Sequence, residues 1–251
     1  MAEKKTHKIV SASTGETVTN RPRPGAVAAK SGNATGLRVG AVILWILALV
    51  FEVLAIAFIF DKIAILPKIQ PLYKAIGALV LDLIFVIIGS QLWKKANHID
   101  PASQKNAFKF WLWNNMGVIV AAIAFIPFII LLLTNKEADK KTKIIGTAVA
   151  GIFLVISGLA SYDWNPISAE ALAAANAGQV VYWTEHGKKF HIYDDCQSLQ
   201  KKETEVLYTG TAQEAMDNGK GTICKFCEKR FEQEQPELLE AAQEAAAAVN
   251  E

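Results

Sequence analysis

The chain has little charge and few cysteines for its length. Of its 251 residues only 20% are charged and 52% are apolar, whereas soluble domains carry about 25% charged residues. Three cysteines are too few for the disulfide framework of a small secreted fold. The net charge of +2 is too small to indicate nucleic-acid binding. These shortages exclude a single soluble domain of this length, and the mean hydropathy of +0.24 favours a membrane protein with polar ends.

Four apolar runs are long enough to cross a bilayer. A hydrocarbon core about 30 Å thick requires about 20 apolar residues in a helix, and such runs occupy residues 41–60, 73–93, 110–133 and 144–162. The runs are apolar on every side, whereas helices of a soluble protein keep a polar face. We therefore predict an all-α bundle of four transmembrane helices that contacts the lipid bilayer.

Positive charges in the connecting segments predict the orientation of the bundle. The first 38 residues and the loop after the second run hold eleven Lys and Arg. The other side holds seven, six in its two loops and Lys74 at the start of the second run. Segments rich in Lys and Arg stay in the cytoplasm. With four spans, both termini are predicted to be cytoplasmic, in a multi-pass protein of the bacterial inner membrane.

Two acidic residues lie inside the first two runs. Glu52 and Asp82 are each roughly fifteen residues from the middle of the short connection, so adjacent antiparallel helices bring them to similar depth. A charge at the centre of a span costs about 2.5–3.5 kcal/mol. The pair is therefore either an intramembrane proton or ion site, or protonated carboxyls that hydrogen-bond across the helices. The candidate partners in the second reading are Ser90, Asn114, Asn115 and Ser157.

All three cysteines lie in the polar C-terminal part of the chain. Cys224 and Cys227 form a CxxC turn that directs two thiolates toward one ion, and Cys196 supplies a third. A structural zinc site requires four Cys or His ligands, and His191 is the best fourth ligand. His186 competes for that place but falls in an expected hairpin turn. An odd number of cysteines fits such a site better than a set of disulfides.

The same cysteines could in principle serve a redox pair or another metal. A redox CxxC pair needs a thioredoxin-like βαβ context, which is absent here. Iron or another soft metal is an alternative to zinc, whereas Asp194 and Asp195 are hard ligands that suit a thiolate site poorly. Three thiolates and one imidazole leave no open coordination position. We therefore predict zinc as the cofactor, in a structural role, and no enzyme activity.

The sequence around these ligands predicts a small α+β domain over residues 180–231. Residues 180–184 and 189–193 are expected to pair as a hairpin. Thr211 and Glu214 form a capping box that begins a helix. Because about 50 residues rarely sustain a core alone, the metal is expected to supply much of the folding free energy.

This segment resembles the Ada-type metal-binding domain. The resemblance rests on a T-x-x-E-A…G…C-x-x-C pattern with GKKFHIYDDC as its upstream half; the matching residues are Thr211, Glu214, Ala215, Gly219, Cys224 and Cys227. It implies a small zinc module and does not extend to the membrane part. The DNA-repair member of that family has a methyl-accepting cysteine at the first upstream ligand, where this chain has His191. The resemblance therefore does not carry over the repair chemistry.

The predicted organisation has five parts. These are a disordered basic tail (1–38), a transmembrane domain (39–162), a linker (163–179), the zinc-binding domain (180–231) and an acidic Ala/Glu-rich tail (232–251). The zinc-binding domain holds eight basic and eight acidic residues, and phosphate binding requires a basic excess. Nucleic acid is therefore not an expected partner.

The function predicted from these parts is interaction or scaffolding by a cytoplasmic zinc module. Its partners would be the bilayer, a protein bound through the C-terminal domain, and a second copy of the chain. The aromatic residues Tyr182, Trp183 and Phe226 are candidates for its binding surface or for packing around the metal. One alternative is a small proton- or ion-coupled transporter or channel that uses Glu52 and Asp82. Another is a membrane-tethered sensor that contacts DNA.

Overall fold

The computed structural model divides the chain into two compact units. The residues it describes are 7–18, 33–63, 65, 67–200 and 204–234. One unit, here called the bundle unit, contains Asn33–Ala96 and Trp111–Trp164. The other, called the α+β unit, contains the described residues of Met1–Gly32, Asn97–Phe110 and Asn165–Glu251. The α+β unit therefore draws on three separate stretches of sequence.

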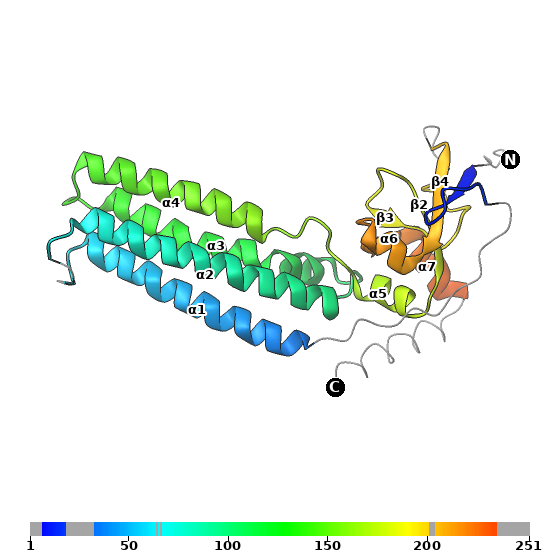
Figure 1. Ribbon diagram of the computed structural model, residues 1–251, viewed down its shortest axis with the longest axis horizontal. Coiled ribbons are helices and arrows are strands. Elements are labelled where there is room, and N and C mark those ends of the chain that lie inside the picture. The colour runs from blue at the N-terminus through cyan, green and yellow to red at the C-terminus, as the bar shows by residue number, and fades with distance from the viewer. Residues whose placement is uncertain (1–6, 19–32, 64, 66, 201–203, 235–251) are drawn as a thin grey trace. The chain divides into compact units, whose positions relative to one another are not determined.

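Four long helices run side by side in the bundle unit (Figure 1). They are α1 (Ala34–Ile59), α2 (Pro71–Ile99), α3 (Ala107–Thr134) and α4 (Lys140–Ser161). Each is long and apolar enough to cross a membrane. The predicted fold class is confirmed: a helical membrane bundle together with a small α+β unit.

Local side chains account for the bounds of these helices. Asn33 caps α1 by accepting a hydrogen bond from the Gly36 amide at 2.7 Å. Asp139 caps α4 in the same way, with the Thr142 amide as donor at 3.2 Å. Pro127 lies inside α3 without ending it, as neighbouring helices allow in a membrane.

Small side chains line the interior of the bundle unit. The alanines with no exposed surface there include Ala48 and Ala55 of α1, Ala121 and Ala124 of α3, and Ala150 of α4. Small residues let helix backbones approach closely. Large aliphatic side chains such as Val53, Ile152 and Val155 face outward and are more than half exposed. This arrangement suits a bundle surrounded by lipid.

The strands of the α+β unit form a three-stranded sheet and a separate strand pair. The sheet has the order β1-β4-β2, with β1 (Lys8–Ser11) parallel and β2 (Val180–Trp183) antiparallel to β4 (Val206–Thr211). The separate pair is parallel and consists of β3 (Lys189–Phe190) and β5 (Thr222–Ile223). The helices are α5 (Ala169–Asn176), α6 (Ala212–Asp217) and α7 (Lys225–Glu234).

Two local predictions for the α+β unit have different outcomes. The capping box of α6 is present, since Thr211 and Glu214 each accept a hydrogen bond from the other's backbone amide. The hairpin of 180–184 and 189–193 is reduced to one bridge between Tyr182 and His191, closed by hydrogen bonds of 2.7 and 2.6 Å. Both arms pair mainly with strands much later in the chain, which local sequence does not reveal.

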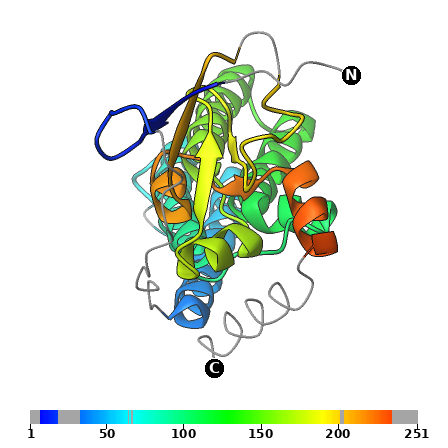
Figure 2. The ribbon, with the colours of Figure 1, turned by 90° about the vertical axis from the view of Figure 1, so that its right-hand side faces the viewer.

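Part of the predicted disordered N-terminal tail is an ordered strand. Figures 1 and 2 show β1, in dark blue, alongside β4. The Lys8 amide donates to Glu205 O at 3.2 Å, and the Ala12 amide donates to Thr209 O at 2.9 Å. Ile9 packs against the core of the unit. The prediction for 1–38 was wrong for this strand, because the tail's low average hydrophobicity hides a short segment that a distant strand orders.

The predicted linker is also folded in part. Ser168 caps α5 by accepting a hydrogen bond from the Ala171 amide at 3.2 Å. Ala171 and Ala175 are buried in the same core as the strands. The described residues from 165 onward belong to the α+β unit. Residues 1–6 and 19–32 of the predicted N-terminal tail, and 235–251 of the acidic tail, lie outside the described residues.

Candidate metal centre

Two of the four predicted ligands follow neighbouring strand ends, a third lies in the loop after β3, and the fourth lies in α7. Phe190 of β3 is in register with Ile223 of β5, and His191 and Cys224 follow these two residues directly. The Cys224 amide donates to Phe190 O at 2.9 Å, which fixes the end of β5. Helix α7 begins immediately after Cys224 and places Cys227 one turn further on.

The geometry of the cluster fits a tetrahedral metal site. His191, Cys196, Cys224 and Cys227 are buried, and their ligand atoms all lie within 4.8 Å of one another. The Sγ atoms of Cys196 and Cys224 are 3.9 Å apart, and Cys227 Sγ lies 3.7 Å from His191 Nδ1. Zinc–sulfur bonds of about 2.3 Å and zinc–nitrogen bonds of about 2.0–2.1 Å give tetrahedral edges of about 3.8 and 3.6 Å.

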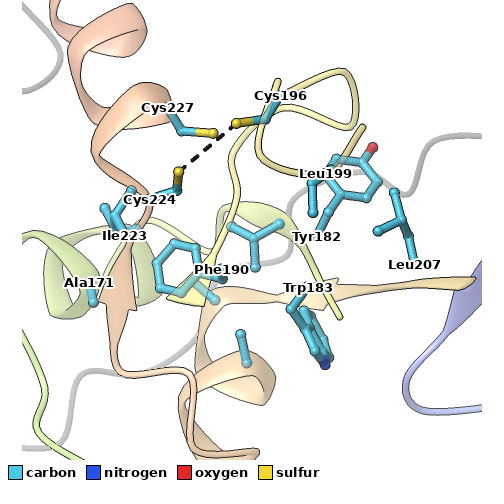
Figure 3. Packing of buried hydrophobic residues seen from close by; sticks show 14 of the residues in the cluster. Ala171, Tyr182, Trp183, Phe190, Cys196, Leu199, Leu207, Ile223, Cys224 and Cys227 are labelled. Carbon is cyan, nitrogen blue, oxygen red and sulfur yellow. Dashed lines mark hydrogen bonds between the residues drawn. The ribbon is translucent and has the colours of Figure 1, made fainter. Parts of the chain in front are cut away.

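The three sulfur atoms point toward one another, as Figure 3 shows. A disulfide requires an S–S distance of about 2.05 Å, so the separation of 3.9 Å between Cys196 and Cys224 excludes one there. Apolar side chains, Phe190 and Ile223 among them, pack around the sulfurs. The cluster is therefore a buried site that could hold a metal ion.

The ligand groups of the cluster shift one another's pKa values. Burial lowers the pKa of His191, but hydrogen bonds to Cys196 and Cys224 outweigh it and raise that pKa to about 9. Hydrogen bonds from Cys196 and Cys227 lower the pKa of the Cys224 thiol. The pKa of Cys227 is raised by its contacts with the other two sulfurs and by burial. A divalent ion would displace these protons as it binds.

The competing ligands lie outside the cluster. His186 is exposed in the turn between β2 and β3. Asp195 is held by Arg230 at 2.8 Å, and the Arg230 guanidinium stacks over the ring of Tyr193 at 4.0 Å from its centroid. Among the described residues, the histidine that lies with the three cysteines is His191.

An open cavity of about 260 Å³ adjoins the cluster. Its lining consists of Tyr193, Asp195, Cys196, Gln197, Phe226, Cys227 and Arg230. Phe226 is 54% exposed, whereas Tyr182 and Trp183 are buried in the core of the unit. Of the three aromatic candidates for a binding surface, Phe226 alone is exposed.

The loop between α2 and α3 hydrogen-bonds to residues that flank the CxxC turn, which no sequence pattern predicted. The Gln104 side-chain amide donates to Ile223 O at 3.2 Å and to Glu228 Oε2 at 2.7 Å. Ser103 and the Gln104 backbone amide donate to the two carboxylate oxygens of Glu170. Gln104 precedes the ligands by nearly 90 residues, so no local pattern connects it with them.

The intramembrane acids lie together in the bundle unit. Glu52 is 5% exposed and Asp82 has no exposed surface, and the two side chains interact electrostatically. Glu52 Oε1 and both carboxylate oxygens of Asp82 have no hydrogen-bond partner among the described residues.

Three of the four predicted polar neighbours of these acids bond within their own helices. Ser90 donates to Val86 O at 2.7 Å, Ser157 to Leu154 O at 3.1 Å, and Asn115 to Trp111 O at 2.8 Å. These three contacts provide no cross-helix hydrogen bond to Glu52 or Asp82.

Comparison with known proteins finds no matching family model, curated protein or solved structure. The resemblance to the Ada-type domain is therefore not confirmed. Evidence for function comes from the cluster, its surroundings and the four apolar helices.

Proposed function

We propose that this protein is a multi-pass membrane protein that presents a zinc-stabilised interaction module in the cytoplasm. The observation that carries the proposal is the buried cluster of three sulfurs and one imidazole, whose ligand atoms all lie within 4.8 Å of one another. Four protein ligands fill the coordination shell of zinc, which is typical of structural sites. The metal would hold a fold together, and we propose no catalytic role for it.

The topology of the chain supports a module on one side of the membrane. If each of the four helices crosses once, the segment before α1, the α2–α3 loop and the chain after α4 share one side. All three contribute described residues to the α+β unit. The excess of Lys and Arg in the first two of these segments favours the cytoplasmic side.

The surface beside the metal cluster supports a protein partner. Phe226 lies between the cysteines of the CxxC turn, is exposed and lines the cavity. Exposed aromatic residues and arginines supply much of the binding energy in protein interfaces. Arg230 borders the same cavity. The balanced charge of residues 180–231 favours a protein over nucleic acid as the partner.

Metal analysis of the full-length protein in detergent tests the proposal. We expect one zinc per chain, and loss of zinc in Cys224→Ser and His191→Ala. His186→Ala is the matched control, because it removes an exposed histidine outside the cluster and should keep the metal. Unchanged zinc content in Cys224→Ser would contradict the proposal. The full chain is needed, since a C-terminal fragment lacks β1 and Gln104.

A second candidate function is ion-coupled transport through the bundle. It is favoured by the fully buried Asp82, whose two oxygens have no partner among the described residues. Intramembrane acids often mark proton or ion pathways. Proton flux into proteoliposomes should then fall in Glu52→Gln and Asp82→Asn but persist in Glu137→Gln, which changes an exposed loop acid. Equal flux in all four proteins would reject this candidate.

A further inference from the structure

The loop between α2 and α3 is short and forms part of the α+β unit. Helix α2 ends at Ile99 and α3 begins at Ala107, so residues 100–106 alone connect two membrane-crossing helices. The same stretch is grouped with the α+β unit and contributes contacts to it. Any displacement of these residues therefore acts on the ends of both helices.

A single side chain of this loop contacts both ends of the ligand turn. Gln104 Nε2 donates to the carbonyl of Ile223, which precedes Cys224, and to the carboxylate of Glu228, which follows Cys227. The Glu228 amide in turn donates to Cys224 O at 2.9 Å. The turn that presents two sulfurs to the metal is thus held from behind by Gln104.

A buried carboxylate holds the loop in this position by accepting hydrogen bonds from it. Glu170 of α5 is 4% exposed, and its oxygens accept hydrogen bonds from the Ser103 hydroxyl and the Gln104 backbone amide. The Ala169 amide donates to Ala102 O at 3.2 Å. A buried charge without donors is strongly unfavourable, so Glu170 favours the docked loop. Gln104 itself is 8% exposed.

We propose that Gln104 is a positioning residue of the metal centre and that the α2–α3 loop couples metal binding to the ends of α2 and α3. The inference rests on the proposed function, because it assumes that the cluster binds zinc. Bound metal fixes the Cys224–Cys227 turn and with it the two acceptors of Gln104. Coupling between two sites is reciprocal. Docking of the loop must therefore raise the affinity for the metal by the same factor by which bound metal raises the equilibrium constant for docking.

Metal affinity of full-length variants tests the role of Gln104. Its removal takes away one hydrogen bond to a buried carbonyl and one to a carboxylate, so Gln104→Ala should weaken zinc binding by about tenfold or more. Glu228→Ala should also weaken binding, whereas Glu228→Gln keeps an acceptor oxygen and should bind zinc nearly as the wild type does. Gln213→Ala is the matched control, since Gln213 contacts Asp217 on the surface of α6.

Two further readouts separate positioning from a general loss of structure. The absorption spectrum of bound Co²⁺ should change in Gln104→Ala, because the sulfur geometry relaxes, and should be unaltered in Gln213→Ala. In the wild type, zinc chelation should increase amide hydrogen exchange in residues 100–106 relative to the middle of α4. A Gln104→Ala protein with wild-type zinc affinity and Co²⁺ spectrum, or a loop whose exchange ignores chelation, would overturn the inference. Failure of the wild type to bind zinc would instead overturn the proposed function.

Discussion

Gly221 offers a sharp test of how the metal centre is built, because its α-carbon faces backbone of another segment. A methyl group at this position would collide with the carbonyl of Pro166 and the α-carbon of Ile167. The Ser168 amide also donates to Gly221 O at 2.9 Å, which ties the two segments together. Backbone atoms cannot rotate aside as a side chain can, so Gly221→Ala must push β5 away from the start of α5.

The expected magnitude follows from overpacking. Forcing an extra carbon into a packed site costs about 1–3 kcal/mol, and Gly221 is three residues before Cys224. The shift should therefore lower zinc affinity of the full-length protein as well as its stability. If half of that strain is relieved when the metal leaves, zinc affinity falls by roughly two- to thirteenfold.

Competition with a fluorescent zinc chelator measures this affinity, and thermal unfolding in detergent measures the stability. Gly151→Ala provides the control, since a methyl group at that position of α4 would have no neighbour within 4 Å among the described residues. Alanine there should stabilise the helix by about 0.5–1 kcal/mol. A Gly221→Ala protein with wild-type zinc affinity and unfolding temperature would refute the packing of β5 against the start of α5.

Three other predictions concern the α+β unit. Glu170→Ala removes the acceptor of two donors from the α2–α3 loop, and should lower the free energy of unfolding by about 2–5 kcal/mol in urea titrations. Ala12→Pro removes the amide that donates to Thr209 O and should expose the N-terminal segment to limited proteolysis, whereas Ser13→Ala should not. The raised pKa of His191 means that zinc must displace a proton below about pH 9, so apparent zinc affinity should fall as the pH is lowered, in chelator competition at several pH values. Because the pKa of His191 in the folded protein is about 9 and the usual histidine pKa is about 6.5, the proton on His191 stabilises the zinc-free unit. This stabilisation is fully present below about pH 6.5 and is lost as the pH rises through about 9.

Local patterns were sufficient to predict the spans, the capping box and the four clustered side chains. Each depends on residues close in sequence or on residue types with few alternative uses. The i, i+3 spacing of Cys224 and Cys227 and the placement of His191 five residues before Cys196 belong to this class. Uninterrupted apolar runs of about 20 residues are typical of membrane-spanning helices and rare elsewhere.

The remainder of the α+β unit depends on contacts between distant parts of the chain. Strand β1 pairs with β4 across nearly 200 residues. The side chain of Ile9 gains an apolar core to pack against only when this pairing forms. Gln104 lies in a loop that reads as an ordinary polar connection, and its partners Ile223 and Glu228 are about 120 residues away. Because such contacts carry no periodic signal, averaging over a local window cannot detect them.

X-ray absorption at the zinc edge of the zinc-loaded full-length protein tests the central claim most directly. Three sulfur neighbours at about 2.3 Å and one nitrogen neighbour at about 2.0–2.1 Å are predicted. The four ligand atoms lie within 4.8 Å of one another, and the separations of 3.9 and 3.7 Å match the edges of such a site. A shell made mainly of oxygen, or a sulfur count unchanged in Cys224→Ser, would contradict the assignment of these four residues as one metal centre.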